Sequence, residues 1–396
     1  MTKRLTFAVS LAIALGAVGC QEPTTDPMAS STARPELRKQ TPPGRDRPQR
    51  VGLRLPRSAR VLDLAVPRLP RKAIDPDDYV CNPLTPVISI FIEEFNEFVV
   101  EEPARFNLFF NILWADLIPT YESFFFLTDD APQVFGYDGE YTHVLQKTHR
   151  DAKRFWDIPS DQIQMVALKG TMLQDEARTA ATYQLPIGPP EPYGLTADSA
   201  AKVAALIRQE LLASQVLDGG NHSLFSFNAF AFWTEDGSLP EKIIMGDAIM
   251  AAYAALGFGD VAPQAIYAHE FAHHIQHLNG YFEEVPPGPA PDTQAEFTRY
   301  TELMADAYSA YYLTHKRGAA MNKHRVAEFL EVFFQIGDCG FFSPDHHGTP
   351  NQRMRAAQLG FDVADQAHKQ GHILTSDQFH DLFVDAYPDI VAPDAA

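Results

Sequence analysis

The sequence predicts an α+β fold with a mainly helical body and a small antiparallel sheet beside one helix near residue 270. Apolar residues recur at helical spacing in long segments that carry recognisable capping residues. Two short segments, 223–233 and 242–247, have the alternating or apolar pattern of strands. The chain is 45% hydrophobic and 11% aromatic over 396 residues, which is ample material for a buried core.

Residues 1–20 have the features of an export signal. Lys3 and Arg4 precede an apolar run that is too short to span a bilayer, and small residues then lead to Cys20. The ending Ala-Val-Gly-Cys resembles the lipobox of bacterial lipoproteins, which implies that Cys20 is lipidated after cleavage. The alternative is an ordinary secretory signal with an unmodified cysteine. We therefore expect export to the bacterial cell envelope and a lipid anchor in a membrane.

Residues 21–76 are rich in Pro, Arg, Ser and Thr without apolar periodicity, which predicts a disordered tether. Charge separates this segment from the rest of the chain. Residues 1–76 carry 14 Lys and Arg against 6 Asp and Glu, a net charge of +8, whereas 77–396 carry the remaining 18 and 45, a net charge of −27. We do not expect so acidic a globular part to bind nucleic acid through bulk electrostatics.

Two cysteines, Cys81 and Cys339, remain after Cys20. In an exported protein such a pair predicts a disulfide, here between the start of the folded region and its far end. Two buried free thiols are the alternative.

Residues 77–225 are expected to form an aromatic-rich, mainly helical region packed on the part that follows. Phe91, Phe95 and Phe98 recur at helical spacing within 84–127, and acidic residues interrupt this segment too often for a membrane span. Core-facing helices are favoured. A hydrophobic face that docks on a membrane or a partner is the alternative.

Further helices are predicted in the same region. The segment 141–158 has a helical pattern, whereas the rest of 134–185 is compatible with helix or strand. Thr196 is a suitable N-cap for a helix that runs to Leu217, shortly before two glycines.

Residues 226–396 are expected to hold the chemistry. After the strand 242–247 comes a helix that ends in glycine. The next helix covers 261–280, with Pro263 suited to its first turn and Gly280 to its end.

The decapeptide AHEFAHHIQH within that helix contains the pattern HExxH. His269 and His273 are four residues apart, so they lie about 40° apart around the helix and leave the same edge of it. Glu270 lies about 100° from His269, beside a metal ion held by the two rings but not bound to it. This is the arrangement of two zinc ligands and a general base for a zinc-bound water. Two ligands do not make a catalytic zinc site, so a third is required.

The third ligand is predicted on the following helix, 293–315. Glu302 would complete a His-His-Glu set for one zinc ion, and Asp306 would accept a hydrogen bond from a ligand histidine and fix its tautomer. The alternative is that both are solvated charges. Gln276 and Asn279 stand where the metzincin pattern requires Gly and His, so that class is excluded.

Four blocks, HEFAHHIQ, ELMAD at 302–306, IGD at 336–338 and HGTPNQRMRAAQLGF at 347–361, together resemble the neutral zinc metallopeptidases of bacteria. The resemblance implies a zincin-like fold of the gluzincin type, zinc ligands at His269, His273 and Glu302, and a catalytic Glu270. Residues 21–225 lie outside it. The sequence departs from the pattern of that family at Ala272, Cys339 and Pro350.

The other candidates carry weaker signals. His347 is either the electrophile that stabilises an oxyanion or part of a loop that shapes the site. His274 and His277 are predicted to be surface or packing residues. We expect Arg353 to pair with an acid such as Asp338. Two tyrosines of the Glu302 helix, Tyr300 and Tyr308, are expected in the core.

These observations predict a membrane-tethered zinc metallopeptidase that acts on peptide or protein substrates. Glu270 would remove a proton from the zinc-activated water and deliver it to the leaving amine. An extended peptide would lie along an edge strand, either 242–247 or the aromatic strand before it. Two alternatives stay open: a catalytically silent envelope lipoprotein that binds a partner and keeps zinc for stability, and a zinc hydrolase of a non-peptide amide.

Overall fold

A computed structural model describes most of the chain after residue 79. The described residues are 80–82, 84–187, 193–234, 236–284, 286, 294–321, 323–341, 343, 345–368 and 372–394. The predicted signal segment 1–20 with Cys20 and the predicted tether 21–76 lie outside them. Within the described ranges, no helix is both long enough and apolar enough to cross a membrane.

Three strands form one small mixed sheet. They are β1 (Gln164–Leu168), β2 (Ala229–Phe232) and β3 (Lys242–Gly246), in the order β1-β3-β2. β3 pairs with β2 in antiparallel and with β1 in parallel orientation. The expectation of a purely antiparallel sheet is therefore wrong. It did not include β1, because the pattern of the segment 134–185 is compatible with helix or strand.

The observed strands differ from the predicted ones in length and in their place in the sheet. Of 223–233 only β2 is extended, because the ring of His222 accepts a hydrogen bond from the backbone of Leu224 and starts a short helical turn. β3 lies between two partners, so an added peptide cannot pair with 242–247. That expectation is wrong for β3, and β2 is left as the edge strand of the two candidates.

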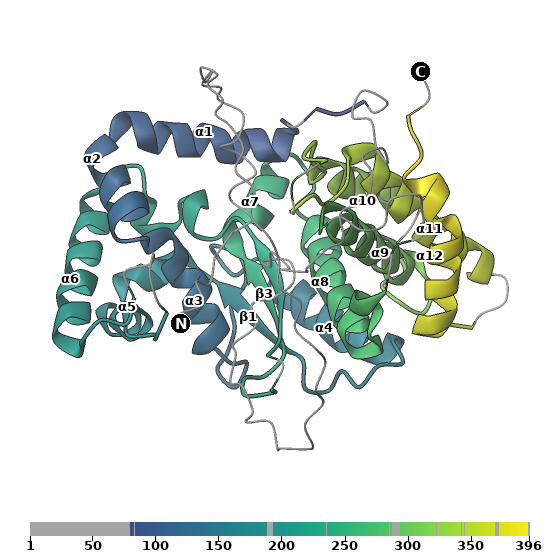
Figure 1. The fold of residues 1–396 in the computed structure, drawn as a ribbon, viewed down its shortest axis with the longest axis horizontal. Helices are drawn as coiled ribbons and strands as arrows, with labels where there is room; N and C mark the ends of the chain where they lie inside the picture. The colour runs from purple at the N-terminus through teal and green to yellow at the C-terminus, as the bar shows by residue number, and fades with distance from the viewer. Residues whose placement is uncertain are drawn as a thin grey trace, which may run out of the picture.

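Helices surround the sheet on both sides (Figure 1). Their bounds are α1 (Pro86–Glu101), α2 (Pro103–Phe106), α3 (Ile118–Phe125), α4 (Thr142–Phe155), α5 (Glu176–Tyr183), α6 (Ala197–Ala213), α7 (Asp247–Ala255), α8 (Ala262–Asn279), α9 (Gln294–Thr314), α10 (Lys323–Gln335), α11 (Pro350–His368) and α12 (Ser376–Ile390). A π-helical turn spans Asn107–Ile112, and 3-10 turns span Ala115–Leu117, Gly170–Gln174, Asp218–Gly220, Ser223–Phe225 and Tyr281–Glu283.

The sheet separates two hydrophobic cores, because successive residues of a strand point to opposite faces. One core is formed with α3, α5, α6 and most of α1, and the other with α4, α7 to α12 and Val87 at the start of α1. In Figure 1, α3, α5 and α6 lie to the left of the sheet and α1 runs above it. Val166 and Ile244 belong to the first core, whereas Met165 and Ile243 belong to the second. The sheet thus joins the aromatic-rich region to α8, which carries the HExxH motif, and to the helices packed around it.

The aromatic segment 84–127 is helical and faces inward. Phe91, Phe95 and Phe98 of α1 are buried in the first core, as their spacing predicts. Residues from the region 77–225 also reach the second core. β1 pairs with β3, and α4 contacts the HExxH helix through His149, whose Nδ1 lies 2.7 Å from the hydroxyl of Tyr267.

Helix α8 starts and stops as its sequence predicts. Pro263 lies in the first turn, and Gly280 ends the helix with a positive φ of 77°, a conformation that glycine adopts without strain. α9 packs beside α8, and α11 packs closely on α9. A Cβ atom at Gly360 would come within 2.2 Å of the carbonyl oxygen of Ala307, so only glycine permits this approach.

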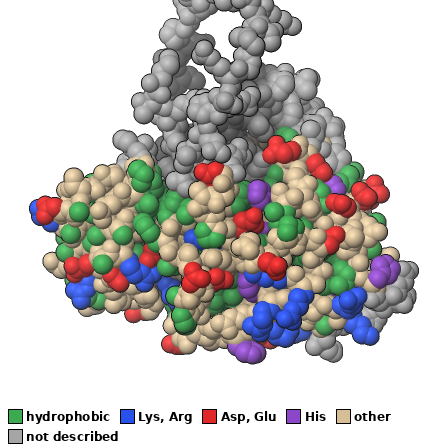
Figure 2. Space-filling view, turned by 90° about the horizontal axis from the view of Figure 1, so that it is seen from below, with side chains coloured by type: hydrophobic (Ala, Val, Ile, Leu, Met, Phe, Trp, Pro, Cys, Tyr) green, Lys and Arg blue, Asp and Glu red, His purple; other side chains and the backbone are tan. Residues whose placement is uncertain are grey.

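The surface seen from below the sheet is mixed in charge (Figure 2). Asp and Glu side chains are spread across it, and Lys and Arg side chains form a group at the lower right with others toward the left end.

A disulfide joins Cys81 to Cys339, with the two Cα atoms 5.8 Å apart, and closes a loop across 258 residues. Neighbouring bonds attach the same segment to the end of α10. The hydroxyl of Thr85 donates to the carbonyl of Gln335, and the side chain of Gln335 accepts from the backbone of Val87. The start of the described chain is therefore fixed beside the loop that follows α10.

Replacing both cysteines with serine should lower the free energy of unfolding by about 2–4 kcal/mol, because the unfolded chain regains the freedom that the cross-link removes. Urea denaturation of the parent and of the double variant, each with and without reductant, measures this. Reductant should weaken the parent alone. Equal stability of the two oxidised proteins would contradict the prediction.

Candidate metal centre

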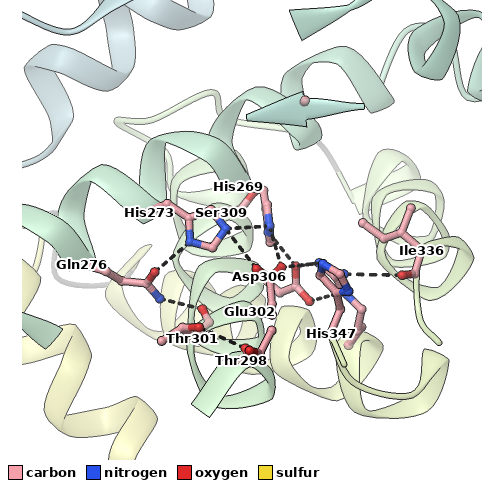
Figure 3. A network of polar contacts seen from close by, with 12 residues as sticks. His269, His273, Gln276, Thr298, Thr301, Glu302, Asp306, Ser309, Ile336 and His347 are labelled. Atoms are coloured by element: carbon pink, nitrogen blue, oxygen red, sulfur yellow. Dashed lines mark hydrogen bonds and ion pairs between the residues drawn. The ribbon is translucent and has the colours of Figure 1, made fainter. Parts of the chain in front are cut away.

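Two histidines of α8 and one glutamate of α9 bring their ligand atoms together between the helices (Figure 3). Nε2 of His269 lies 3.2 Å from Nε2 of His273 and 3.1 Å from Oε2 of Glu302. Nε2 of His273 lies 3.4 Å from Oε1 of Glu302. All three residues are buried. The three residues predicted as zinc ligands thus form one buried group that could hold a metal ion.

The second nitrogen of each ring faces an acceptor oxygen. Nδ1 of His269 lies 2.9 Å from Oδ1 of Asp306, as predicted, and Nδ1 of His273 lies 2.8 Å from Oε1 of Gln276. Both rings therefore turn their Nε2 atoms toward Glu302. Bonds of this kind orient ligand histidines in metal sites.

The chemistry of these atoms fits a divalent cation. With both Nδ1 atoms donating, the two Nε2 atoms present lone pairs beside a carboxylate, and such atoms repel unless a proton or a metal ion lies between them. In the metal-free chain, a proton on His269 takes the place of the metal ion. Burial lowers the pKa of His269, but hydrogen bonds to Asp306 and Glu302 outweigh it and raise the pKa to about 10. Two imidazoles and one carboxylate are a known ligand set of catalytic zinc.

Glu270 lies beside this group with a free oxygen. Glu270 is only 5% exposed, and its Oε2 has no hydrogen-bond partner among the described residues. Burial raises the pKa of Glu270 to about 7, while a hydrogen bond from the backbone of Ala231 in β2 acts in the opposite direction. A carboxyl group of this pKa suits both the uptake and the release of a proton near neutral pH.

The loop between α10 and α11 brings His347 toward the ligand group. Oδ1 of Asp338 lies 2.6 Å from Nδ1 of His346, and Oδ2 accepts the backbone N–H of His347 at 2.7 Å. Burial lowers the pKa of His347, but the charges of Glu302 and Asp338 raise it above its ordinary value. The placement suits an electrophile, and the same bonds also serve a structural loop, so both interpretations of His347 stand.

Arg353 pairs with an acid, as expected, but the acid is Asp306 and not the suggested Asp338. Its Nε and Nη2 atoms lie 2.7 Å from the two carboxylate oxygens of Asp306. Nη2 also lies 3.8 Å from Oε2 of Glu302. The sequence did not show which acid the start of α11 would meet, because that depends on how α11 packs against α9.

The HGTPNQR block is the start of α11. The backbone N–H of Thr349 donates to Oε1 of Gln352 at 3.0 Å, and Oγ1 of Thr349 accepts the backbone N–H of Gln352 at 3.2 Å. This is a capping box. Pro350 occupies the first helical position, which proline favours, so the departure at that residue suits the helix. The cap fixes the start of α11, and Arg353, one turn after Thr349, contacts Asp306 from there.

The remaining histidines of α8 serve packing, as predicted. Both nitrogens of His274 face oxygens at the start of β3, Oε2 of Glu241 at 3.1 Å and the carbonyl of Lys242 at 3.0 Å. His277 stacks on Trp233 with ring centroids 4.4 Å apart. In α9 the two tyrosines are buried in the core, as expected, at Tyr300 and Tyr308.

The sequence reading missed the role of Gln276. That residue entered the argument as a departure from the metzincin pattern and as the end of the block HEFAHHIQ, without a role of its own, yet it contacts the ring of His273. The available signal was spacing, because residues three apart on a helix lie on neighbouring positions of its surface.

Comparison with known proteins finds similar sequences in Escherichia coli. The chain is 32% identical over 122 residues to YpfJ, a protein described as uncharacterized, in strain K12 and in serotype O6:H1. The aligned part is 28% of this chain and 42% of that protein. No family model and no solved structure matches the chain. The function proposed below therefore rests on the geometry of the site.

The purified chain should bind about one zinc ion through these three ligands. His269→Ala and Glu302→Gln should each abolish retention of the ion during dialysis, because two donors hold zinc too weakly. Elemental analysis by mass spectrometry gives the metal content per chain. His277→Ala, on the same helix, is the control and should retain the ion. Full retention by either ligand variant would show that the ion binds elsewhere.

Arg353→Leu should lower the free energy of unfolding by about 3–5 kcal/mol, because it removes the guanidinium that pairs with both oxygens of the buried Asp306 carboxylate and leaves only His269 beside it. Adding Asp306→Asn should recover part of this loss by removing the unpaired charge. Urea denaturation of the metal-free proteins measures both effects. A loss below about 1 kcal/mol for Arg353→Leu would mean that the pair resembles an exposed ion pair in strength.

Proposed function

We propose that this chain is a zinc-dependent metallopeptidase, tethered to a membrane through a lipid on Cys20. The observation that carries the proposal is the combination of a buried His-His-Glu group with a neighbouring carboxylate that has a free oxygen. A structural zinc site normally uses four protein ligands and needs no such carboxylate.

In this proposal His269, His273 and Glu302 hold one zinc ion. When bound, zinc polarises the scissile carbonyl and makes a water molecule acidic enough to lose a proton near neutral pH. The protein supplies the orientation. Asp306 fixes the ring of His269, and Arg353 balances the charge of Asp306.

Glu270 acts as the general base. Its free Oε2 accepts a proton from the attacking water and later delivers this proton to the nitrogen of the leaving amine. Burial favours the transfer, because little water surrounds the carboxylate and stabilises its charge, so it accepts a proton more readily. The adjacent backbone of Ala231 holds the carboxylate next to β2.

The substrate is an extended peptide that pairs with the edge of β2. β2 has β3 on one side, and its Ala231 faces Glu270. A peptide added along the other side would therefore pass the base, and its backbone would gain hydrogen bonds that do not depend on its sequence. His347 then serves as the electrophile that donates to the developing oxyanion.

Glu270→Gln should lower the rate of peptide hydrolysis by about 100- to 10,000-fold, because the amide cannot accept the proton. Zinc content should not change. The assay follows cleavage of a fluorescently labelled unstructured protein by the zinc-loaded chain, with and without a chelator.

The matched control is Glu97→Gln, an exposed glutamate of α1, which should cleave as well as the parent. A Glu270→Gln variant that keeps the activity of the parent would contradict the role of Glu270. A zinc-loaded parent that cleaves no peptide would favour the silent lipoprotein or the hydrolase of a non-peptide amide.

A further inference from the structure

Gln276 connects the two helices that carry the predicted zinc ligands. It is fully buried and lies three residues after His273 on α8. Its Oε1 is 2.8 Å from Nδ1 of His273, and its Nε2 donates to the backbone carbonyl of Thr301 at 2.6 Å. Thr301 immediately precedes Glu302 on α9, and Figure 3 shows this chain of contacts on one side of the ligand group.

The contacts of Gln276 leave one orientation for its amide group. A backbone carbonyl only accepts hydrogen bonds, so the NH₂ end of Gln276 must face Thr301 and the oxygen must face His273. Nδ1 of His273 must then carry the proton and donate it. The other ring nitrogen, Nε2, is left with a lone pair directed at Glu302.

The neutral charge of Gln276 also suits its position. The buried space already holds the carboxyl groups of Glu270, Glu302 and Asp306. Arg353 pairs with Asp306, whereas Gln276 bonds to the ring of His273 and to the backbone carbonyl of Thr301. A neutral acceptor therefore orients His273 without adding a negative charge that would need a partner of its own.

We infer that Gln276 is a positioning residue for the metal ion. It fixes the tautomer of His273 and sets the distance between His273 on α8 and Glu302 on α9. This inference rests on the zinc site of the proposed function. Its tests measure metal affinity and ring protonation and do not depend on peptide hydrolysis.

Gln276→Leu removes both hydrogen bonds and should weaken zinc binding about 10- to 100-fold, the usual effect of losing a group that orients a metal ligand. Competition with a chromophoric chelator measures the affinity of the full chain. Gln264→Leu is the matched control, because Gln264 lies on the same helix and its side chain donates to the backbone carbonyl of Asp260, away from the ligand group. It should bind zinc like the parent.

A second readout uses the metal-free chain. With ¹⁵N-labelled histidine, long-range ¹H–¹⁵N correlation spectra report which ring nitrogen is protonated, and a His273 variant assigns the signal. Neutral His273 should carry its proton on Nδ1 in the parent and in Gln264→Leu. In Gln276→Leu both tautomers should be populated.

Gln276→Glu covers the case in which the leucine variant does not fold. Glutamate can still accept from His273 but cannot donate to Thr301, so it should keep the tautomer and bind zinc more weakly than the parent. Parent-like affinity in whichever of the two variants folds, or a parent-like tautomer in Gln276→Leu, would overturn the inference. Absence of zinc binding by the parent would contradict the proposed function, and the tautomer measurement would still decide whether Gln276 fixes the ring of His273.

Discussion

Burying the carboxylates of Glu302 and Asp306 between α8 and α9 requires positive charge beside them, and the site is built around this constraint. Asp306 has its cation in Arg353, which arrives from the first turns of α11. Among the described residues, Glu302 has no arginine or lysine at hydrogen-bonding distance, since Nη2 of Arg353 lies 3.8 Å from its Oε2. It faces the Nε2 atoms of His269 and His273, and in the metal-free chain the proton between these atoms lies on His269. The two Nε2 atoms and the carboxylate repel one another when neither a proton nor a metal ion lies between them. The same atoms form the ligand set of a zinc ion.

Elements outside the two helices hold the ligand group and Glu270 in place relative to each other. β2 presents the backbone of Ala231 to Glu270, and His274 fastens α8 to the start of β3. On the opposite side, Asp338 holds the loop with His347, and the neighbouring Cys339 joins that loop to the start of the described chain. The sheet and the disulfide thus stabilise the site from both sides without contributing a ligand.

Short-range patterns in the sequence were enough to predict the ligand-bearing helices. The spacing of His269 and His273 and the capping residues of α8 depend only on residues within one helix. Long-range partners were harder to predict. β1 was ambiguous because a short apolar run fits a strand or a buried helix, and its parallel pairing with β3 depends on contacts across 78 positions. The choice of Asp306 by Arg353 depends on the packing of α11, and the bridge from Gln276 to Thr301 depends on the spacing of α8 and α9.

X-ray absorption at the zinc edge of the metal-loaded chain tests the central claim most directly. The account predicts a four-coordinate ion with nitrogen and oxygen neighbours at about 2.0–2.2 Å, including the multiple-scattering signal of two imidazoles and no sulfur. An ion surrounded by six oxygens, or one bound to sulfur, would contradict the claim that α8 and α9 hold zinc through two histidines and a glutamate.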